Sequence, residues 1–489
     1  MTAVSPTADA LPAGEAARNR LVISLLLVST FVVILNETIM GVALPHLMAD
    51  LGVSASAAQW LTTAFLLTMA VVIPITGLLL QRLHTRPVFM LAMATFSAGT
   101  LICALAPGLP VLILGRVVQA VGTAIMMPLL MTTIMTLVPP EARGRTMGNI
   151  SIVISVAPAI GPTISGIILS VLDWRWMFIL VLPIALGSLA LGAWRIVNVT
   201  TPRYAPFDPL SVVLSVLGFG GLVYGLSTIG EAAGEGAGLP VWIPLTVGAV
   251  ALVAFVLRQT ALQKEDKALL DLRTFSARLF TIAVIMLAIS MIALFGAFIL
   301  LPIYLQNVLG LDALQTGLLL LPGGLVMGLL APIVGRLYDR YGPTVLVVPG
   351  AALVSLVLWG MTQMTETTPV PILLAGHVVL CTGLALMFTP LFTAGLGALP
   401  PQLYSHGSAV VGTIQQVAGA AGTALFVALM SGQAARLMAE GLSQVAATAG
   451  GIRAAFLCGA ILSLFAVIAA FFVRRPAAGA FPAEAVPGH

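Results

Sequence analysis

The sequence has very little charge for its length. Only 8% of its 489 residues are Asp, Glu, Lys or Arg, whereas an average soluble protein has about 25%. Hydrophobic residues make up 60%, against roughly 45–50% in soluble domains. A soluble fold of this size needs a charged surface that this chain cannot supply. The composition therefore excludes an ordinary soluble protein, and the formal net charge of +4 is too small to indicate nucleic acid as a partner.

Cysteine is also scarce, and motifs for bound metals or nucleotides are missing. The three cysteines, Cys103, Cys381 and Cys458, lie inside apolar runs, so no disulfide framework is indicated. The sequence has no phosphate-binding loop, no Cys/His cluster with metal-ligand spacing and no catalytic triad pattern. We therefore predict no catalytic residue, no metal and no cofactor. ATP-driven work by this chain alone is excluded, and an enzyme is disfavoured.

Long apolar runs stand where a soluble protein would have charge. Fourteen segments are long and apolar enough to cross a ~30 Å hydrocarbon core as helices. They are expected at residues 21–45, 57–80, 88–106, 110–137, 148–171, 176–195, 209–229, 240–257, 279–304, 314–335, 343–362, 370–396, 408–430 and 453–473. The first run is too long for a signal-peptide core, and the first 17 residues are expected to be a disordered tail. The predicted fold class is an all-α membrane protein.

The basic residues test this number of spans. With the N-terminus in the cytoplasm, the outer side receives only Arg175, Arg436 and Arg453, and Arg116 lies within the membrane. The other 17 of the 21 Lys and Arg residues fall on the inner side. A missed or extra helix would scramble this alternation. The split therefore supports fourteen spans with both termini in the cytoplasm.

Internal matches at a near-constant offset indicate a duplication. Residues 77–82 (GLLLQR) resemble 335–340 (GRLYDR) at an offset of 258, and 115–118 (GRVV) resemble 376–379 (GHVV) at an offset of 261. Duplicated bundles are typical of transporters, whose substrate site lies between the repeats near the midplane. The predicted domains are a tail at 1–20, an N-terminal six-helix bundle at 21–197, a linker with two inserted helices and a basic cytoplasmic loop at 198–278, a C-terminal six-helix bundle at 279–475 and a tail at 476–489.

Four motifs carry a resemblance to a known family: residues 35–45 (LNETIMGVALP), 114–122 (LGRVVQAVG), 157–166 (APAIGPTISG) and 174–178 (WRWMF). With them, nearly the whole chain resembles the fourteen-helix drug:proton antiporters of the major facilitator superfamily. These are the EmrB/QacA-like group, and within it the chain is most similar to the LmrB-like lincomycin-resistance branch. The resemblance implies a major facilitator fold with 14 transmembrane helices, arranged as two six-helix bundles plus two inserted helices.

The same resemblance implies a function. It implies proton-coupled multidrug or antibiotic efflux by alternating access, with neutral or monocationic lipophilic compounds exported in exchange for protons. The expected partners are small lipophilic drugs, protons and membrane lipids, in a monomer that crosses a bacterial inner or plasma membrane many times. One alternative is a proton-coupled exporter of a specific endogenous metabolite or lipid. A more remote alternative is a membrane receptor or enzyme.

The chain departs from the family pattern at two places. Much of the family has Asp where this chain has Asn36, and the carboxylate stands one place later, at Glu37, a 100° rotation on a helix. The loop motif Gly-x-Leu-x-Asp-Arg-x-Gly is degenerate in the first half, where Gln81 replaces the Asp, and intact in the second half. The expected cytoplasmic gating motif comprises Gly77, Gln81, Arg82, Gly335, Asp339, Arg340 and Gly342. We expect its contact to be stronger on the C-terminal half.

Glu37 and Arg116 are the expected proton-coupling residues. Glu37 is the only carboxylate deep in any expected span, and an ionised acid at the bilayer centre costs at least ~2.5–3.5 kcal/mol, so it should face a polar cavity. The alternative is a structural carboxyl bonded to a neighbouring helix. Arg116 is the only basic residue within a span. It could tune the proton affinity of Glu37, bind an anionic part of a substrate, or tie helices together through backbone carbonyls.

Further residues are expected in the substrate cavity or in the seal around it. Gln119, Thr123 and Met127 lie on one helical face with Arg116, which lines the cavity or forms a packing stripe. The other expected cavity residues are Asn36, Trp60, Gln415, Gln416 and His377. Trp60 could instead be an interface anchor, and a buried histidine such as His377 is more often structural. The antiporter motif, Pro158, Gly161, Pro162 and Gly166, is expected to kink its helix and allow close backbone approach, and the resemblance implies that it prevents proton leak.

Overall fold

The structure is a computed structural model that describes residues 13–199, 202, 206–231 and 240–474. Within these ranges every regular element is a helix. Fourteen helical segments are long and apolar enough to cross a membrane, and they coincide with the fourteen expected spans. The predicted all-α membrane fold is therefore confirmed.

The helices follow one another along the chain with short connections. The first six are α1 (Ala13–Leu51), α2 (Ala55–Arg82), α3 (Thr85–Ala104), α4 (Leu109–Leu137), α5 (Arg143–Val171) and α6 (Trp176–Arg195). Two further spans follow: α7 (Pro209–Ser215), the π-helix η2 (Val216–Gly220) and α8 (Gly221–Glu231) form one, and α9 (Trp242–Leu262) forms the other. The last six are α10 (Arg278–Asn307), α11 (Ala313–Tyr341), α12 (Thr344–Met361), α13 (Val370–Gly397), α14 (Tyr404–Ala439) and α15 (Gln444–Ala470).

The first helix extends further than its apolar run. Residues 13–17, expected to be disordered, form the start of α1, because Ala and Glu continue a helix readily outside the hydrocarbon. The helix α14 likewise spans 36 residues, more than the expected 408–430. Residues 1–12 of the expected N-terminal tail and the whole expected tail at 476–489 lie outside the described residues.

Helix α11 shows how the local sequence sets the helix boundaries. The side chain of Asp312 accepts a hydrogen bond from the backbone N–H of Gln315 (2.7 Å), and the Gln315 side chain accepts one from the N–H of Asp312 (3.1 Å), which is a capping box. At the other end Gly342 has φ 83°, a left-handed conformation that only glycine adopts without steric cost. The last glycine of the intact loop motif therefore ends the helix that carries Asp339.

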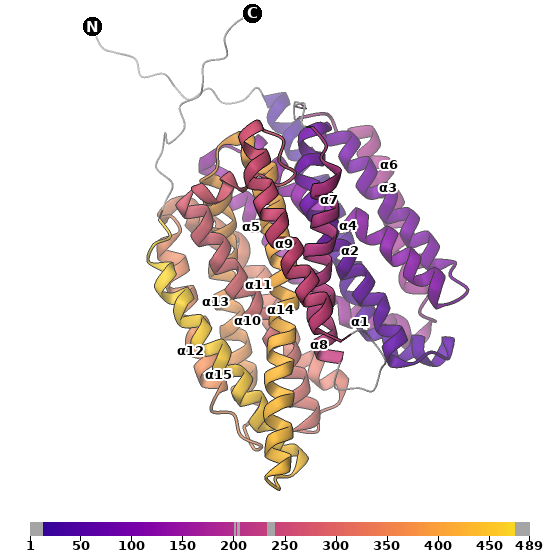
Figure 1. The fold of residues 1–489 in the computed structure, drawn as a ribbon, viewed down its shortest axis with the longest axis vertical. Coiled ribbons are helices and arrows are strands. Elements are labelled where there is room, and N and C mark those ends of the chain that lie inside the picture. The colour runs from indigo at the N-terminus through magenta and orange to yellow at the C-terminus, as the bar shows by residue number, and fades with distance from the viewer. Residues whose placement is uncertain (1–12, 200–201, 203–205, 232–239, 475–489) are drawn as a thin grey trace, which may run out of the picture.

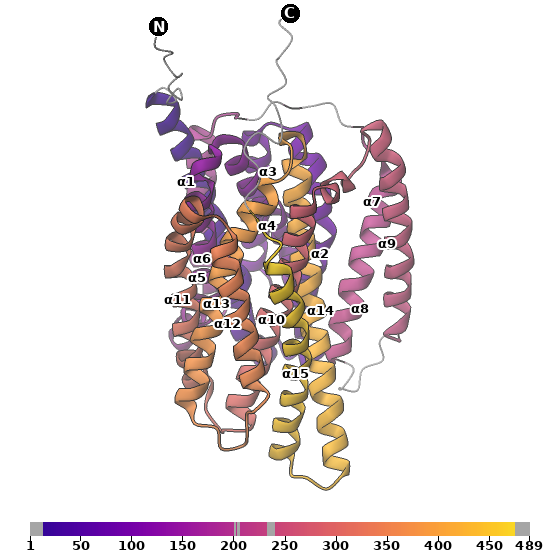
Figure 2. The same cartoon turned by 90° about the vertical axis from the view of Figure 1, so that its left-hand side faces the viewer.

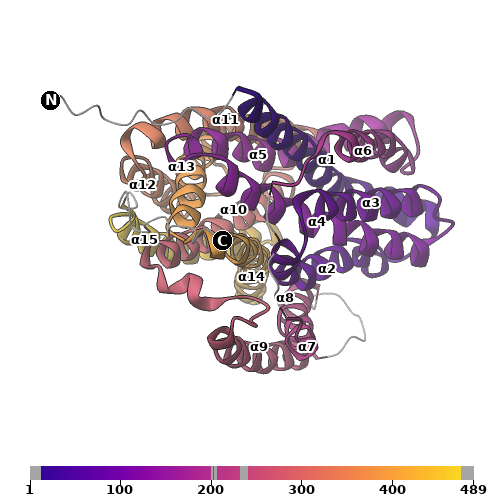
Figure 3. The same cartoon turned by 90° about the horizontal axis from the view of Figure 1, so that it is seen from above.

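The helices sort by their contacts into two groups and an added hairpin. Most of the helices α1 to α6 pack chiefly on one another, and most of α10 to α15 do the same; α5 and α11 are the exceptions, because they pack most extensively on each other across the two groups. The span made of α7, η2 and α8 pairs with α9, and α8 packs on both α2 and α14. Seen from above, this inserted hairpin lies outside the two groups beside α2 and α14 (Figure 3). The domain boundaries stated above remain predictions.

The two groups touch through their backbones where α5 begins and α11 ends: a Cβ added at Gly144 or Gly148 would lie 2.6 Å from the carbonyl oxygen of Gly335 or Ala331, respectively. Figures 1 and 2 show the helix groups from two sides, with α1 beginning at this end of the molecule.

One contact line joins α5 to α11 and α13; there Ser151 and Thr389 share a hydrogen bond of 2.7 Å. The other joins α2 and α4 to α14; there the Thr132 hydroxyl donates to the Ser408 hydroxyl at 3.1 Å. We call these lines the α5–α11 seam and the α2–α14 seam, and this end of the molecule the sealed end.

Packing inside the first group depends on backbone contact between α3 and α4. A Cβ added at Gly122 would lie 2.3 Å from the carbonyl oxygen of Ala92 and 2.7 Å from the nitrogen of Phe96. Since these are backbone atoms, they cannot rotate away as a flexible side chain would. The glycine therefore sets the distance between the two helices.

We expect Gly122→Val to destabilise the protein by about 1–3 kcal/mol or more, the usual cost of overpacking a core. The matched control is Gly187→Val in α6, where an added Cβ has no neighbour within 4 Å. The measurement is the midpoint of thermal unfolding of both purified variants in the same detergent. Equal midpoints for the two variants would contradict the close contact of α3 with α4.

Candidate functional site

Arg116 lies buried at the centre of the first helix group, with 1% of its surface exposed. Its Nη1 donates to Oε1 of Gln119 (2.6 Å) and to Oδ1 of Asn36 (3.3 Å). Its guanidinium carbon stands 4.0 Å from the centre of the Phe65 ring, a cation–π contact. The cation is therefore held by two neutral acceptors and an aromatic face, supplied by α1, α2 and α4.

Gln119 extends this polar network to α3. Its Nε2 donates to the hydroxyl of Thr100 (2.8 Å), and the Thr123 hydroxyl donates to its backbone carbonyl (3.1 Å). Both Gln119 and Thr123 are buried. Two donors, Nε of Arg116 and Nδ2 of Asn36, are buried without a hydrogen-bond partner among the described residues. The network is thus built to hold a charge while leaving part of its hydrogen-bonding capacity unused.

Glu37 leaves helix α1 in a different direction from Asn36. Asn36 points toward α4, and Thr38 points toward α5, where its hydroxyl lies 3.5 Å from the carbonyl oxygen of Ala157. Glu37 stands 100° from each of them around the helix. Its side chain is only partly buried and makes no hydrogen bond to any residue that the structure describes. The carboxyl is therefore next to the Arg116 network without being tied into it.

The antiporter motif on α5 packs against this part of α1 through one glycine. A Cβ at Gly161 would lie 2.3 Å from the hydroxyl oxygen of Thr38, so α1 and α5 are in close contact there. Gly166 is exposed and has no neighbour within 4 Å of such a Cβ, and Pro158 is partly buried. The side chain of Pro162 lies outside the described residues. Close backbone approach thus applies to Gly161 and not to Gly166.

The remaining expected cavity residues do not gather around Arg116. Trp60 is 41% exposed, and its ring centre lies 5.9 Å from that of Tyr224 in α8, so it contacts the inserted hairpin. His377 is buried; its Nε2 lies 3.1 Å from the carbonyl oxygen of Leu320, which ties α13 to α11. Met127 packs at the margin of the apolar core, Gln416 is partly exposed, and the buried Nε2 of Gln415 has no partner within the described ranges.

The intact loop motif fastens the α5–α11 seam. Oδ1 and Oδ2 of Asp339 accept hydrogen bonds of 2.8 Å from the backbone N–H groups of Gly144 and Arg145, in the first turn of α5. A carboxylate at a helix N-terminus is favoured by the free N–H groups and by the helix dipole. A Cβ at Gly335 would lie 2.2 Å from the carbonyl oxygen of Gly144, so the backbones touch. Arg340 lies beside the ring of its neighbour Tyr341, 5.1 Å from the ring centre.

The degenerate copy fastens the α2–α14 seam by other means. Nε2 of Gln81 lies 2.7 Å from Nε2 of His406 in α14, and a Cβ at Gly77 would lie 3.1 Å from Nδ1 of the same ring. The guanidinium of Arg82 lies 5.9 Å from the centre of the Phe207 ring. His406 was not among the residues expected from the sequence. It corresponds to Arg145 at the repeat offset of 261, which is the signal that could have found it.

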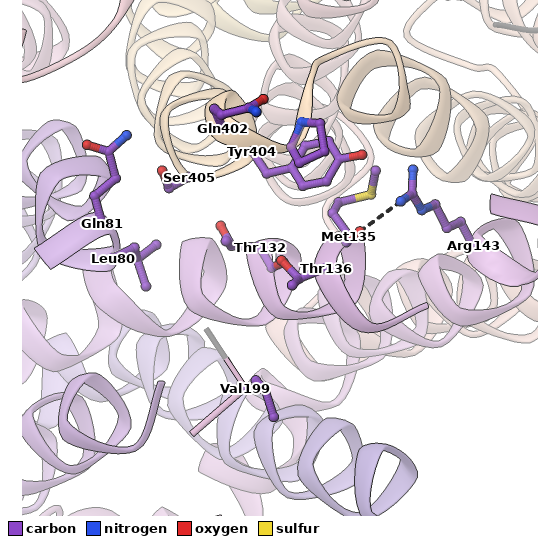
Figure 4. Close-up of a pocket in the computed structure, with 11 residues that line it drawn as sticks. Leu80, Gln81, Thr132, Met135, Thr136, Arg143, Val199, Gln402, Tyr404 and Ser405 are labelled. Atoms are coloured by element: carbon purple, nitrogen blue, oxygen red, sulfur yellow. Dashed lines mark hydrogen bonds between the residues drawn. The ribbon is translucent and has the colours of Figure 1, made fainter. Parts of the chain in front are cut away.

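A cavity of about 340 Å³ lies at the sealed end, between the two helix groups (Figure 4). Its lining combines hydroxyl and amide groups with apolar side chains and one cation, Arg143, whose Nη2 donates to the carbonyl oxygen of Met135 (2.8 Å). The other lining residues are Leu80, Gln81, Thr132, Thr136, Val199, Pro401, Gln402, Tyr404 and Ser405. Nothing in the sequence analysis pointed to this cavity. In the part of the chain that the structure describes, no group of three or more His, Cys, Asp or Glu residues is placed to hold a metal ion.

Comparisons with known proteins agree on one family. A family model described as Major Facilitator Superfamily matches residues 26–423. An uncharacterized MFS-type transporter of Bacillus subtilis, YcnB, is 41% identical over 95% of this chain and 97% of its own length. The lincomycin resistance protein LmrB of Listeria monocytogenes is 41% identical over 94% of this chain and 98% of its own length. Among solved structures, the human organic anion transporter MFSD10 is similar in fold, with a TM-score of 0.65 at 16% identity over 92% of this chain and 99% of its own.

Proposed function

Because the chain belongs to the major facilitator superfamily, we propose that it exports small lipophilic drugs across a bacterial membrane in exchange for protons. Lincomycin is the first substrate to test, since a relative covering nearly the whole chain is named for resistance to it. The proton-exchange part of this proposal rests on one observation: a carboxyl without a hydrogen-bond partner in the described part of the chain lies near a buried cation. Glu37 lies beside the Arg116 network without a hydrogen-bond partner among the described residues.

Glu37 suits proton exchange because no other described carboxylate lies in the middle of a span. In the fourteen spans the other carboxylates, such as Glu141, Glu265 and Asp339, stand at the ends of the helices and not in their middle. A carboxyl that is neither neutralised by a direct ion pair nor fixed by hydrogen bonds responds to what occupies the space around it. A drug that enters this space would displace the proton from the Glu37 carboxyl, and a proton would bind there again once the drug had left.

Alternating access is supported by where the two helix groups touch. Asp339 on the α5–α11 seam and His406 on the α2–α14 seam both lie at the sealed end. If the basic residues orient the chain as predicted, this is the cytoplasmic end. Breaking the two seams would let the groups rock apart and expose the site to the cytoplasm.

A growth-inhibition panel tests the proposal most directly. The chain is expressed in a host that lacks its own efflux pumps, and the panel includes lincomycin and lipophilic compounds of different charge. We expect raised resistance to lincomycin and to at least one other compound, and none with a Glu37→Gln chain at equal membrane levels. Unchanged sensitivity to every compound, with the protein present in the membrane, would contradict drug export and favour an endogenous metabolite or lipid as substrate.

Substrate charge is expected to decide which part of the proton gradient drives export. The span at 314–335 contains no carboxylate, so we expect Glu37 alone to neutralise a cationic drug. Exchange of a neutral drug for one proton moves one charge, and the membrane potential then contributes ~2.3 kcal/mol per 100 mV. Exchange of a monocation for one proton moves none.

Collapsing the membrane potential at a fixed pH gradient should therefore slow the export of neutral drugs and spare that of monocations. The measurement uses proteoliposomes, with ionophores that set the potential and the pH gradient separately. Dications should be poor substrates. Robust dication transport, or equal sensitivity of both drug classes to the potential, would contradict a single acidic group exchanging one proton.

A further inference from the structure

His406 joins three separate parts of the chain at the sealed end. The residue belongs to α14, and its side chain is buried. Its Nε2 lies 2.7 Å from the side-chain amide of Gln81 in α2, and its Nδ1 accepts a hydrogen bond of 3.3 Å from the backbone N–H of Asp271, in the connection between α9 and α10. One ring therefore links both helices of the α2–α14 seam to the segment that follows the inserted hairpin.

The two contacts define the tautomer of the ring. Because Nδ1 accepts from a backbone N–H, the proton of a neutral imidazole is on Nε2, which donates. The Gln81 amide satisfies this donor by presenting its oxygen. A half-turn about its last bond exchanges its nitrogen and oxygen without steric cost. Gln81 is therefore an acceptor in this contact, as the family's Asp would be.

The segment at Asp271 is itself held rigidly. The buried carboxylate of Asp271 accepts from Nε of Arg273 at 2.9 and 3.0 Å and from the backbone N–H of Arg273 at 2.9 Å. These hydrogen bonds raise the pKa of the Arg273 guanidinium above its usual range, so this partner of Asp271 stays charged. The N–H of Asp271 is thereby fixed in the direction of His406.

Gln259 of α9 ties the same segment to the inserted hairpin. The side chain is fully buried; its Oε1 accepts from the backbone N–H groups of Leu269 (2.8 Å) and Leu270 (3.2 Å). Its Nε2 donates to the hydroxyl of Ser211 in α7 at 2.7 Å. The residue immediately after Leu270 is the one that contacts His406. The hairpin and the histidine are thus connected by hydrogen bonds to two adjacent parts of one backbone segment, residues 269–271.

An ion pair lies at the hairpin end of these hydrogen bonds. The hydroxyl of Ser211 donates to Asp208, the N-cap residue of α7, and Arg258 of α9 donates to both carboxylate oxygens of Asp208 at 2.6 and 2.7 Å. The hydrogen bond from Arg258 holds the pKa of Asp208 well below its usual range, so this carboxylate stays ionised. The two spans of the hairpin are therefore fastened to each other where they meet the sealed end.

The hairpin also lies across the seam itself. Helix α8 packs on α2 from one helix group and on α14 from the other, as Figure 3 shows from above. Trp60 of α2 meets Tyr224 of α8, and a Cβ at Gly220 would lie 3.4 Å from the Val71 side chain. The inserted pair thus touches both sides of the α2–α14 seam along its length and is bonded to it at the sealed end through His406.

We propose that the inserted hairpin is a clamp on the α2–α14 seam, and that His406 is the positioning residue through which the clamp holds this seam closed. The inference rests on the proposed transport by alternating access. It accounts for the degenerate loop motif: the α5–α11 seam has Asp339 and no hairpin, whereas the α2–α14 seam has Gln81 and the hairpin. The hairpin clamp thus stabilises the closed α2–α14 seam, as Asp339 stabilises the α5–α11 seam.

The test measures the opening of the seam directly. Spin labels are attached at Leu83, directly after α2, and at Gln402, just before α14, both at the sealed end. The full-length chain has its three native cysteines replaced by serine and is reconstituted in lipid nanodiscs. We expect His406→Ala to raise the ratio of open to closed molecules about fivefold to thirtyfold, the factor that one or two hydrogen bonds provide. His406→Asn keeps an acceptor for the N–H of Asp271 and should give a smaller rise. The matched control is His46→Ala, an exposed histidine at the other end of α1.

A second pair of variants tests the hairpin. Gln259→Met removes both the acceptor for Leu269 and Leu270 and the donor to Ser211, and should open the seam as His406→Ala does. Gln259→Glu keeps the acceptor and loses only the donor, so it should open the seam less. Opening in His406→Ala without opening in Gln259→Met would overturn the clamp, and no opening in either would overturn the role of His406. Drug resistance is measured on the same chains. If the chain with native His406 and Gln259 confers no resistance while the seam opens as expected in the variants, drug export is rejected and the clamp stands.

Discussion

Replacing Glu37 with Gln is expected to abolish substrate-driven proton release while leaving the protein folded. The amide has the shape of the protonated carboxyl but cannot lose a proton near neutral pH. Because Glu37 makes no hydrogen bond within the described residues, the substitution strands no partner, and the Arg116 network stays intact. In proteoliposomes with a pH-sensitive dye inside, drug addition should release no more protons than in empty vesicles.

The control for this result is Glu366→Gln, an exposed carboxylate in the connection between α12 and α13. It should leave proton release unchanged at equal protein content. Drug binding by the Glu37 variant, measured by tryptophan fluorescence, should persist, which separates a coupling defect from a folding defect. Undiminished proton-coupled efflux in the Glu37 variant would mean that another group carries the exchanged proton.

The second large effect is expected at the α5–α11 seam, where Asp339→Asn should impair transport more than Gln81→Ala. The oxygen of the asparagine side chain can accept from one of the two N–H groups of Gly144 and Arg145, but its NH₂ group then faces the other N–H. The substitution also removes the negative charge that the start of α5 favours. A charged hydrogen bond contributes about 1.5–3 kcal/mol, so the closed state should lose roughly tenfold or more in population. Gln81→Ala removes a neutral bond from a seam that the hairpin also holds.

The comparison is made as initial efflux rates at equal expression, with Glu141→Gln as a matched surface control next to α5. The spin-label pair used for the α2–α14 seam supplies an independent measure of opening. A larger loss in Gln81→Ala than in Asp339→Asn would reverse the assignment of the stronger contact to the second half.

The spans could be predicted because a membrane imposes a simple rule: a helix must stay apolar for the thickness of the hydrocarbon. The same rule explains what was missed. Hydropathy does not register the polar turns that extend α1 back to Ala13 or α14 to Ala439, since these lie where a helix no longer needs apolar side chains. The division into two groups of six helices came from the repeat offsets, which do not depend on hydropathy.

The contacts of the candidate site could not be predicted to the same degree. The sequence assigned Glu37 and Arg116 to proton coupling and Asn36 to the substrate cavity, but it could not tell whether Asn36 or Glu37 faces the cation. That choice depends on the rotation of α1 against α4, and one residue changes it by 100°. The structure gives the contact to Asn36. His406 was missed for a related reason, because a repeat offset says which positions correspond but not which side chains meet.

The cavity at the sealed end has a pharmacological consequence. Its walls come from both sides of the α2–α14 seam: Leu80 and Gln81 from α2 and Tyr404 and Ser405 from α14. The cavity therefore exists only while this end is shut, and any compound that fills it must leave before the two groups can part. Such a compound would bind one conformation alone and hold the transporter in it, so it would inhibit export without occupying the site around Glu37 and Arg116.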